Sequence, residues 1–502
     1  MRSLEIASLI VTGILFLVAV TGRPQQWWTQ NRSQQRNVLP AIILSAIAVL
    51  VPILSIVVHQ SRLSMWPIYF TSFILAGYFL WRMRGLEKER KASVNVPRPM
   101  RIIGRSIIAV AVILPSLAAA AFTQAFPVVD LPAPTGAHSV GFRQQTFIDD
   151  SREERLSEDP KDKRTLKVAI YYPAESASAP AASLPTGYFG VPIANELNIH
   201  GPMRDGAISL FDDHARLIKT HSHPSVPVHN QAHPIIFYSP SYSPIPEDNV
   251  PLAEELASHG YIVVATNHPY TSSQTPYLVS LLEGVQENDA LVTERAKDLS
   301  FLLDKMTGEN ALPSSPFFGK IDLNTVGVIG YSFGAATAVE TVASDPRFDA
   351  AVAIDGSLYG HAVADGKEIP QSLLYITATD HANNMLTIKQ GKMLPNRSEY
   401  QDEAESEWRR YQRIMRSSNP LKVNRWGATM AESNHSSFSY LSLLGPLLVS
   451  TPSDPREEVI TTRTVALDFF NHTLRGNEAQ ILGKSGSYPR PLTFFKDPLA
   501  LE

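Results

Sequence analysis

The sequence predicts an α/β protein, a mostly parallel sheet with helices on both faces, preceded by four apolar helices. Two observations predict this division. Residues 1–126 hold four apolar segments and 13 Lys and Arg against 3 Asp and Glu, a net charge of +10, whereas the rest of the 502-residue chain carries −14. From residue 166 onward, short β-rich segments alternate with helical ones, as in folds whose parallel strands are joined by helices.

The apolar segments come first in the chain, and the ionisable residues within them lie near their ends. They cover residues 4–20, 38–58, 65–81 and 107–126. A bilayer core needs about 20 apolar residues of helix, so we expect residues 1–126 to form a four-span transmembrane region. The alternatives are a buried helical core, a signal peptide in the first segment, and processing after the fourth.

The loops between these segments predict an orientation. The first loop contains Arg23, Arg32 and Arg36 and the third is rich in Lys and Arg, whereas the second contains only Arg62. Positively charged loops stay on the cytoplasmic side. We therefore expect a multi-pass protein of the cytoplasmic (cell) membrane, with everything after residue 126 on the outer face.

The remaining chain is expected to consist of a linker with an entry strand (127–165) and an α/β domain (166–502). The predicted strands are residues 166–172, 234–238, 261–266, 325–330, 350–354 and 373–377. The predicted helices between them are residues 250–259, 288–306 and 333–344. Residues 178–232, rich in Ala, Pro, Ser and His, interrupt the pattern as an insertion beside the carboxyl ends of the strands, where ligands bind in such sheets.

Composition excludes several classes of site. With no Cys, a disulfide scaffold, a thiolate nucleophile and a Cys-ligated metal are excluded. A net charge of −4 gives no indication of nucleic-acid binding. Four His residues of the insertion lie close together in the sequence, but no carboxylate has matching spacing, so we expect a polar loop and neither a metal nor a cofactor. They are His221, His223, His229 and His233.

The sharpest motif is Gly330-Tyr331-Ser332-Phe333-Gly334, between a predicted strand and a predicted helix. This is the context of a G-x-S-x-G nucleophile elbow, in which the tight turn leaves no room for Cβ atoms beside the serine. The N-terminus of the following helix would favour a developing oxyanion. The pattern predicts Ser332 as a nucleophile; the alternative is a strand-to-helix turn with an incidental serine.

A nucleophilic serine needs a base and an acid, in the chain order Ser, Asp, His. His435, in a small polar loop after the predicted strands, is the favoured base, with His361 and His381 as alternatives in earlier loops. Two acids compete, because Asp355 and Asp380 each follow a predicted strand. Spacing alone leaves that choice open.

Further segments resemble the plasma-type platelet-activating-factor acetylhydrolase family and its bacterial esterase relatives. They are Pro134-Thr135-Gly136, the stretch Ala169-Ile170-Tyr171-Tyr172-Pro173-Ala174, residues 256–265, and Arg295-Ala296-Lys297-Asp298-Leu299 ahead of the elbow. The resemblance covers about residues 130–445 and implies the α/β-hydrolase fold and ester hydrolysis without a cofactor.

The same resemblance implies residue roles. Ser332 matches the family's nucleophile, Asp355 its acid and His435 its base, with Asp380 kept as the alternative acid. The backbone N–H groups of Phe333 and Tyr242 match its oxyanion hole. The chain departs from the family here, because Ser239-Pro240-Ser241-Tyr242-Ser243 replaces a glycine-rich loop and Pro240 has no N–H to donate.

These observations together predict a membrane-anchored serine esterase or lipase that hydrolyses lipid-like or short-to-medium acyl esters. Its expected partners are the ester and, through residues 1–126, the bilayer, but no nucleic acid. Two alternatives remain: a polyester- or cutin-like esterase, and a catalytically weak hydrolase scaffold that acts as a membrane binding or sensor module.

Overall fold

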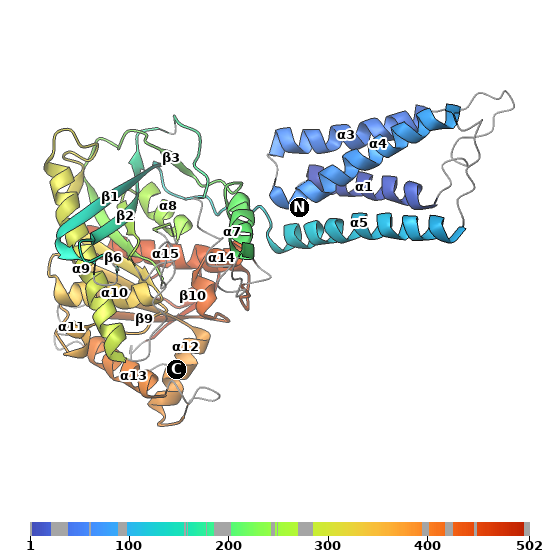
Figure 1. Cartoon of the computed structure of the whole chain (residues 1–502). Coiled ribbons are helices and arrows are strands. Elements are labelled where there is room, and N and C mark those ends of the chain that lie inside the picture. The colour runs from blue at the N-terminus through green and yellow to red at the C-terminus, as the bar shows by residue number, and fades with distance from the viewer. Residues whose placement is uncertain are drawn as a thin grey trace. The chain divides into compact units, whose positions relative to one another are not determined.

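The computed structural model forms two compact units, Met1–Val129 and Asp130–Glu502 (Figure 1). The residues that it describes are 3–21, 39–59, 62–88, 98–154, 157, 159–176, 178–184, 202–241, 246–247, 249–269, 285–393, 401–416, 425–445 and 449–495.

The first unit is helical. Its elements are α1 (Ser3–Thr21), α3 (Leu39–His59), the 3-10 helix η1 (Leu63–Met65), α4 (Trp66–Lys88) and α5 (Arg98–Ala125). The helices meet at two small apolar clusters, one around Leu15 and Leu75 and one around Ile68 and Tyr69. The four apolar segments of the sequence therefore coincide, to within one residue at their ends, with parts of the four long helices.

The interior of this helical unit is partly polar. Arg62 Nε lies 3.1 Å from Glu5 Oε1, with both side chains buried. Arg62 also donates to the Phe126 carbonyl at 3.0 Å. The Ser55 and Tyr69 hydroxyls are 2.9 Å apart and buried. These polar contacts join segments that are distant in the sequence.

The predicted transmembrane region is not supported. Among the residues that the structure describes, no helix combines the length and the apolar character needed to cross a bilayer. The predicted location, a multi-pass protein of the cell membrane with its second unit on the outer face, is therefore wrong. Hydropathy identified the helices but could not detect the buried ion pair and the buried hydroxyls among them. Helix α5 also carries charges in its first turns, because it begins at Arg98 and contains Arg101 and Arg105.

The second unit is built on one eleven-stranded sheet. Its strands are β1 (Ser139–Glu153), β2 (Lys163–Ala174), β3 (Ser222–Pro224), β4 (His233–Ser239), β5 (Ile262–Thr266), β6 (Ile321–Tyr331), β7 (Ala350–Ile354), β8 (Ser372–Ala378), β9 (Arg425–Met430), β10 (Gly486–Ser487) and β11 (Pro491–Phe494). The order across the sheet is β10-β11-β9-β8-β7-β6-β4-β5-β2-β1-β3. Strands β5, β4, β6, β7, β8 and β9 are parallel neighbours, so the predicted, mostly parallel sheet is confirmed.

Helices lie on both faces of this sheet (Figure 1). The helices that the structure describes in this unit are α7 (Pro202–Ala215), α8 (Val250–Ser258), α9 (Val285–Ala311), α10 (Phe333–Ser344), α11 (His361–Ala364), α12 (Thr379–Lys389), α13 (Gln401–Met415), η4 (His435–Phe438), α14 (Leu441–Leu444) and α15 (Pro455–Arg475). Helices α9 and α10 pack together, as do α8 and α15. Because the central strands are fully buried, both faces contribute to the core.

The parallel strands bring their carboxyl ends to one edge of the sheet. β4 ends at Ser239, β6 at Tyr331 and β7 at Ile354, and these three strands are neighbours. The residues that follow them come from distant parts of the sequence but meet at this edge, which is where a ligand site is expected.

Candidate active site

The turn between β6 and α10 holds Ser332 in a backbone conformation that side chains rarely adopt. Its φ is 56° and its ψ is −123°. A Cβ on Gly330 would lie 1.9 Å from the Gly334 carbonyl oxygen, and a Cβ on Gly334 would lie 2.1 Å from the Ser239 carbonyl oxygen. Both glycines are therefore required sterically, and the turn presents Ser332 at the edge of the sheet, as in a nucleophile elbow.

Ser332 and His435 lie within hydrogen-bonding distance. His435 Nε2 is 2.9 Å from Ser332 Oγ, and the imidazole begins η4 with 52 % of its side chain exposed. The Tyr331 ring stacks on the imidazole with centroids 5.1 Å apart, and its hydroxyl donates to the His435 carbonyl at 2.8 Å. The residue next to the serine thus fixes the position of the histidine.

Asp355 lies behind the same imidazole. It follows β7 with a φ of 44°, and its Oδ2 is 2.7 Å from His435 Nδ1. Because an ionised carboxylate only accepts, Nδ1 carries the hydrogen and leaves Nε2 free to accept the Ser332 hydroxyl proton. The predicted serine, histidine and favoured acid therefore form one continuous series of contacts.

The electrostatics of Asp355 keep it ionised. Its side chain is 1 % exposed, and burial by itself would raise its pKa. Hydrogen bonds from His381 and His435 outweigh burial and hold the pKa of Asp355 well below its usual range. The Ala378 N–H also donates to Oδ1 at 2.7 Å.

The other sequence candidates lie elsewhere. Asp380 is in the first turn of α12, where its Oδ1 accepts the backbone N–H of His381 at 2.8 Å. Within the described part of the chain, its side chain makes no hydrogen bond to Ser332 or His435. His361 is the exposed first residue of α11. His381 contacts Asp355 rather than the serine, through Nδ1 at 3.0 Å.

The two predicted oxyanion donors are the backbone N–H groups of Phe333 and Tyr242. Phe333 is the first residue of α10, so its N–H belongs to the helix N-terminus, where such groups point outward and favour negative charge. Tyr242 lies outside the described residues. The segment that leads to it, from Ser239 to Ser241, is described and lies beside the elbow, since Gly334 approaches it closely.

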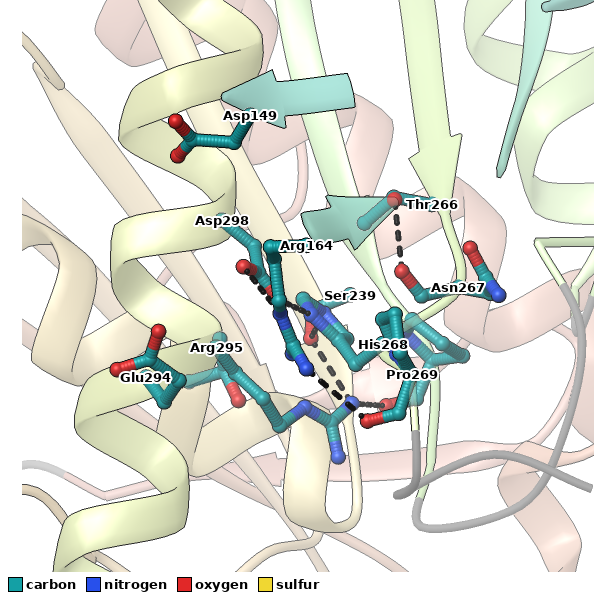
Figure 2. Close-up of polar contacts among 12 residues, drawn as sticks. Asp149, Arg164, Ser239, Thr266, Asn267, His268, Pro269, Glu294, Arg295 and Asp298 are labelled. Atoms are coloured by element: carbon teal, nitrogen blue, oxygen red, sulfur yellow. Dashed lines mark hydrogen bonds and ion pairs between the residues drawn. The ribbon is translucent and has the colours of Figure 1, made fainter. Parts of the chain in front are cut away.

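A buried network fixes that segment (Figure 2). Arg295 of α9 donates through Nη2 to the carbonyls of Pro240 and Ser241 and to Ser239 Oγ. Its guanidinium also lies over the Phe333 ring, 5.1 Å from the centroid. One arginine therefore contacts both the loop after β4 and the start of α10.

Behind Arg295, His268 joins the network to a second carboxylate (Figure 2). His268 Nε2 is 3.1 Å from Ser239 Oγ, and its Nδ1 is 2.8 Å from Asp298 Oδ2. Arg164 donates to both Asp298 oxygens, at 3.0 and 2.7 Å. Ser239, His268 and Asp298 repeat the residue types of the Ser332–His435–Asp355 series, but all three are fully buried, whereas His435 is half-exposed, so we interpret them as structural.

Sequence reasoning missed this network. Arg295 and Asp298 belong to a segment that resembles the family. No local pattern indicated that Arg295 contacts Ser239, or that His268 joins Ser239 to Asp298. Only the position of His268, two residues after the end of β5 and at the same edge of the sheet as the elbow, could have suggested it.

The buried His268 should make the fold sensitive to acid. Burial and the nearby charge of Arg295 lower the pKa of His268 to about 3, whereas an unfolded His titrates near 6.5. As pH falls between these values, the unfolded state binds a proton that the folded state does not, so stability falls. Unfolding in urea should show a loss of about 2 kcal/mol from this residue between pH 7 and pH 5.

Two variants test this expectation. In His268→Asn the amide can still donate to Asp298 but cannot titrate, so the pH dependence of the urea midpoint should become shallower, even if the variant is less stable overall. His361→Asn, at an exposed site, is the matched control and should keep the wild-type slope. An unchanged slope in His268→Asn would show that His268 does not cause the acid sensitivity.

Two of the four His residues of the insertion contact each other, and the other two have partners elsewhere. His221 Nδ1 lies 3.3 Å from Glu254, His223 Nδ1 lies 2.6 Å from the Ala179 carbonyl, and His229 contacts His233 at 3.2 Å. Within the described ranges, no three His, Asp or Glu side chains are grouped so that they could hold a metal ion.

Comparison with known proteins bears out the resemblance. The family model described as platelet-activating factor acetylhydrolase, isoform II, matches residues 292–451. Platelet-activating factor acetylhydrolases of Cavia porcellus (28 % identical, covering 30 % of this chain and 40 % of the relative) and Bos taurus (26 %, covering 33 % and 45 %) are similar. So is a probable 1-alkyl-2-acetylglycerophosphocholine esterase of Arthroderma benhamiae (26 %, covering 30 % and 39 %). The predicted family resemblance is confirmed at low identity, and the aligned region spans less than half of each relative.

A solved structure supports the fold. A ferulic acid esterase from Streptomyces cinnamoneus superposes with a TM-score of 0.56 at 23 % identity, over 74 % of this chain and all of that one. At this identity the likeness concerns the fold, and it confirms the predicted α/β-hydrolase-like architecture of the second unit.

Proposed function

We propose that the second unit is a serine-dependent carboxylic ester hydrolase for lipid-like or short-to-medium acyl esters. The observation that carries the proposal is the series Ser332–His435–Asp355, joined at 2.9 and 2.7 Å next to a strained turn. The family match spans residues 292–451, which include all three residues. The names of the relatives, acetylhydrolase and acetylglycerophosphocholine esterase, favour a lipid ester with a small acyl group.

In the proposed mechanism, Ser332 Oγ attacks the ester carbonyl carbon while its proton passes to His435 Nε2. Asp355 holds the imidazole in the reactive tautomer and stabilises the imidazolium. The N–H groups of Phe333 and Tyr242 would stabilise the tetrahedral oxyanion, at about 3 kcal/mol per donor. The C–O bond to the alcohol then breaks as the alcohol takes the proton, and water releases the acyl group by the same route in reverse.

The elbow geometry favours this function over a non-catalytic scaffold. Ser332 has a positive φ, which costs energy in a residue other than glycine. Such strained positions persist only where the surrounding structure holds them in place, and they cluster at active sites. Pro240, which replaces a residue with an N–H, is the feature that favours a catalytically weak scaffold, but Arg295 donates to the carbonyls of Pro240 and Ser241 and so holds the described part of this segment.

A fluorophosphonate probe tests the proposal directly, because it labels a serine only when a base activates it. The wild-type protein should be labelled and should lose labelling in Ser332→Ala, whereas Ser314→Ala, at an exposed turn, should label as the wild type does. A wild-type protein that is not labelled would favour the non-catalytic scaffold. A panel of esters graded by acyl length, with a polyester film beside it, then separates lipid-like from polyester substrates.

A further inference from the structure

The second oxygen of Asp355 accepts a hydrogen bond from another histidine. His381, in the first turn of α12, has its Nδ1 3.0 Å from Asp355 Oδ1 and its Nε2 3.0 Å from Glu407 Oε1 on α13. Five side chains from separate elements therefore form one line of contacts, Glu407–His381–Asp355–His435–Ser332. The proposed triad accounts for the last three but not for the first two.

The surroundings of His381 require it to carry both ring hydrogens. Each of its ring nitrogens faces a carboxylate, and a carboxylate only accepts, so both nitrogens donate and the ring is an imidazolium. Burial by itself would lower the pKa of His381, but the Glu407 charge and the hydrogen bonds to Asp355 and Glu407 raise it well above its usual range. The imidazolium is 17 % exposed and Glu407 12 %, so water screens the pair only partly.

Two further titratable side chains that the structure describes near this imidazolium are Tyr375 and Asp380. The Tyr375 ring of β8 meets His381 edge-on at 6.4 Å, and burial raises the pKa of Tyr375 well above its usual range, so its hydroxyl stays protonated. The Tyr375 hydroxyl donates to the Gly356 carbonyl and lies 3.4 Å from Glu407 Oε1, and the Ser357 hydroxyl donates to Glu407 Oε2. The carboxylate of Asp380 is engaged with the backbone N–H of His381.

We propose that His381 and Glu407 are positioning residues that extend the proposed Ser332–His435–Asp355 triad and set the pH range in which it hydrolyses esters. This inference rests on the proposed function. A cation on one side of Asp355 offsets part of the negative charge that faces His435. The negative charge that faces His435 is therefore smaller than beside an uncompensated carboxylate. We expect the acid limb of ester hydrolysis to lie at lower pH with a charged His381 than with a neutral residue in its place.

His381→Asn isolates the charge, because its amide can replace the Nδ1 donor to Asp355 without being ionised. The acid limb of the pH profile of kcat/KM for a soluble ester should move to higher pH by about half a unit or more. We expect KM to stay unchanged and the plateau kcat to fall less than about tenfold. A purely structural role would lower kcat at every pH and leave the limb in place.

Glu407→Gln is a second, independent variant. Its amide oxygen can still accept from His381 Nε2 but no longer holds the charge on the ring, so the limb should move in the same direction by a smaller amount. His361→Asn, the same substitution at an exposed histidine, should not move it. If neither His381→Asn nor Glu407→Gln moves the limb, the inference is overturned.

Different results would remove the proposed function and the role of the two positioning residues. A wild-type protein that neither reacts with fluorophosphonate nor hydrolyses esters would remove the proposed function itself. A wild-type protein that does both, with pH profiles superimposable on those of folded His381→Asn and Glu407→Gln, would leave the function intact and remove only the role of the two positioning residues. Circular dichroism of each variant checks that it has folded.

Discussion

Replacing His435 by Ala should lower kcat for p-nitrophenyl acetate by about 10⁵-fold or more. The serine hydroxyl is a weak nucleophile without a base, and His435 Nε2 is within 2.9 Å of it. The KM should change little, because the imidazole acts on the transition state rather than on ground-state binding. Steady-state rates of the purified full chain, measured against a no-enzyme blank, are sufficient for the comparison.

Two companion variants make this result specific. Residues that act as one unit have non-additive effects, so His435→Ala combined with Ser332→Ala should be no slower than either single variant. His361→Ala, at an exposed position outside the site, should keep the wild-type rate. Retention of a tenth or more of the wild-type rate in His435→Ala would move the base to another histidine.

The elbow could be predicted from sequence because its physics is local. The clash distances at Gly330 and Gly334 depend on residues within one turn of Ser332 and on the strand beside it, and this is what the pentapeptide with its flanking elements encodes. The choice between Asp355 and Asp380 as the acid could not be made from local spacing. Both follow a parallel strand, and only the packing of the loop that contains His435 decides which carboxylate meets the imidazole.

Contacts between distant segments explain what the sequence could not reveal. Glu5 and Arg62 form a buried ion pair, which averaged hydropathy records only as isolated charges among apolar residues. His268, Arg295 and Ser239 come from three elements and meet only because parallel strands end at one edge. His381 was an alternative base in the sequence. In the structure it contacts Asp355 Oδ1, whereas His435 contacts Oδ2.

Asp355→Asn should lower kcat by about 10⁴-fold, whereas Asp380→Asn should keep most of the activity. Asp355 accepts hydrogen bonds from His435, His381 and the Ala378 N–H. An asparagine cannot accept from both imidazoles, because its amide nitrogen only donates. His435 would then take the tautomer that presents a hydrogen, not a lone pair, to Ser332.

Among the residues that the structure describes, by contrast, the side chain of Asp380 accepts one backbone N–H, at the start of α12, and asparagine can accept that bond equally well. Rates of p-nitrophenyl ester hydrolysis at the pH optimum of each variant provide the comparison, and thermal unfolding checks that both have folded. The opposite order of activities, with Asp380→Asn inactive and Asp355→Asn near the wild-type rate, would assign the acid to Asp380. It would also imply that the 2.7 Å contact between Asp355 and His435 does not set the tautomer during turnover.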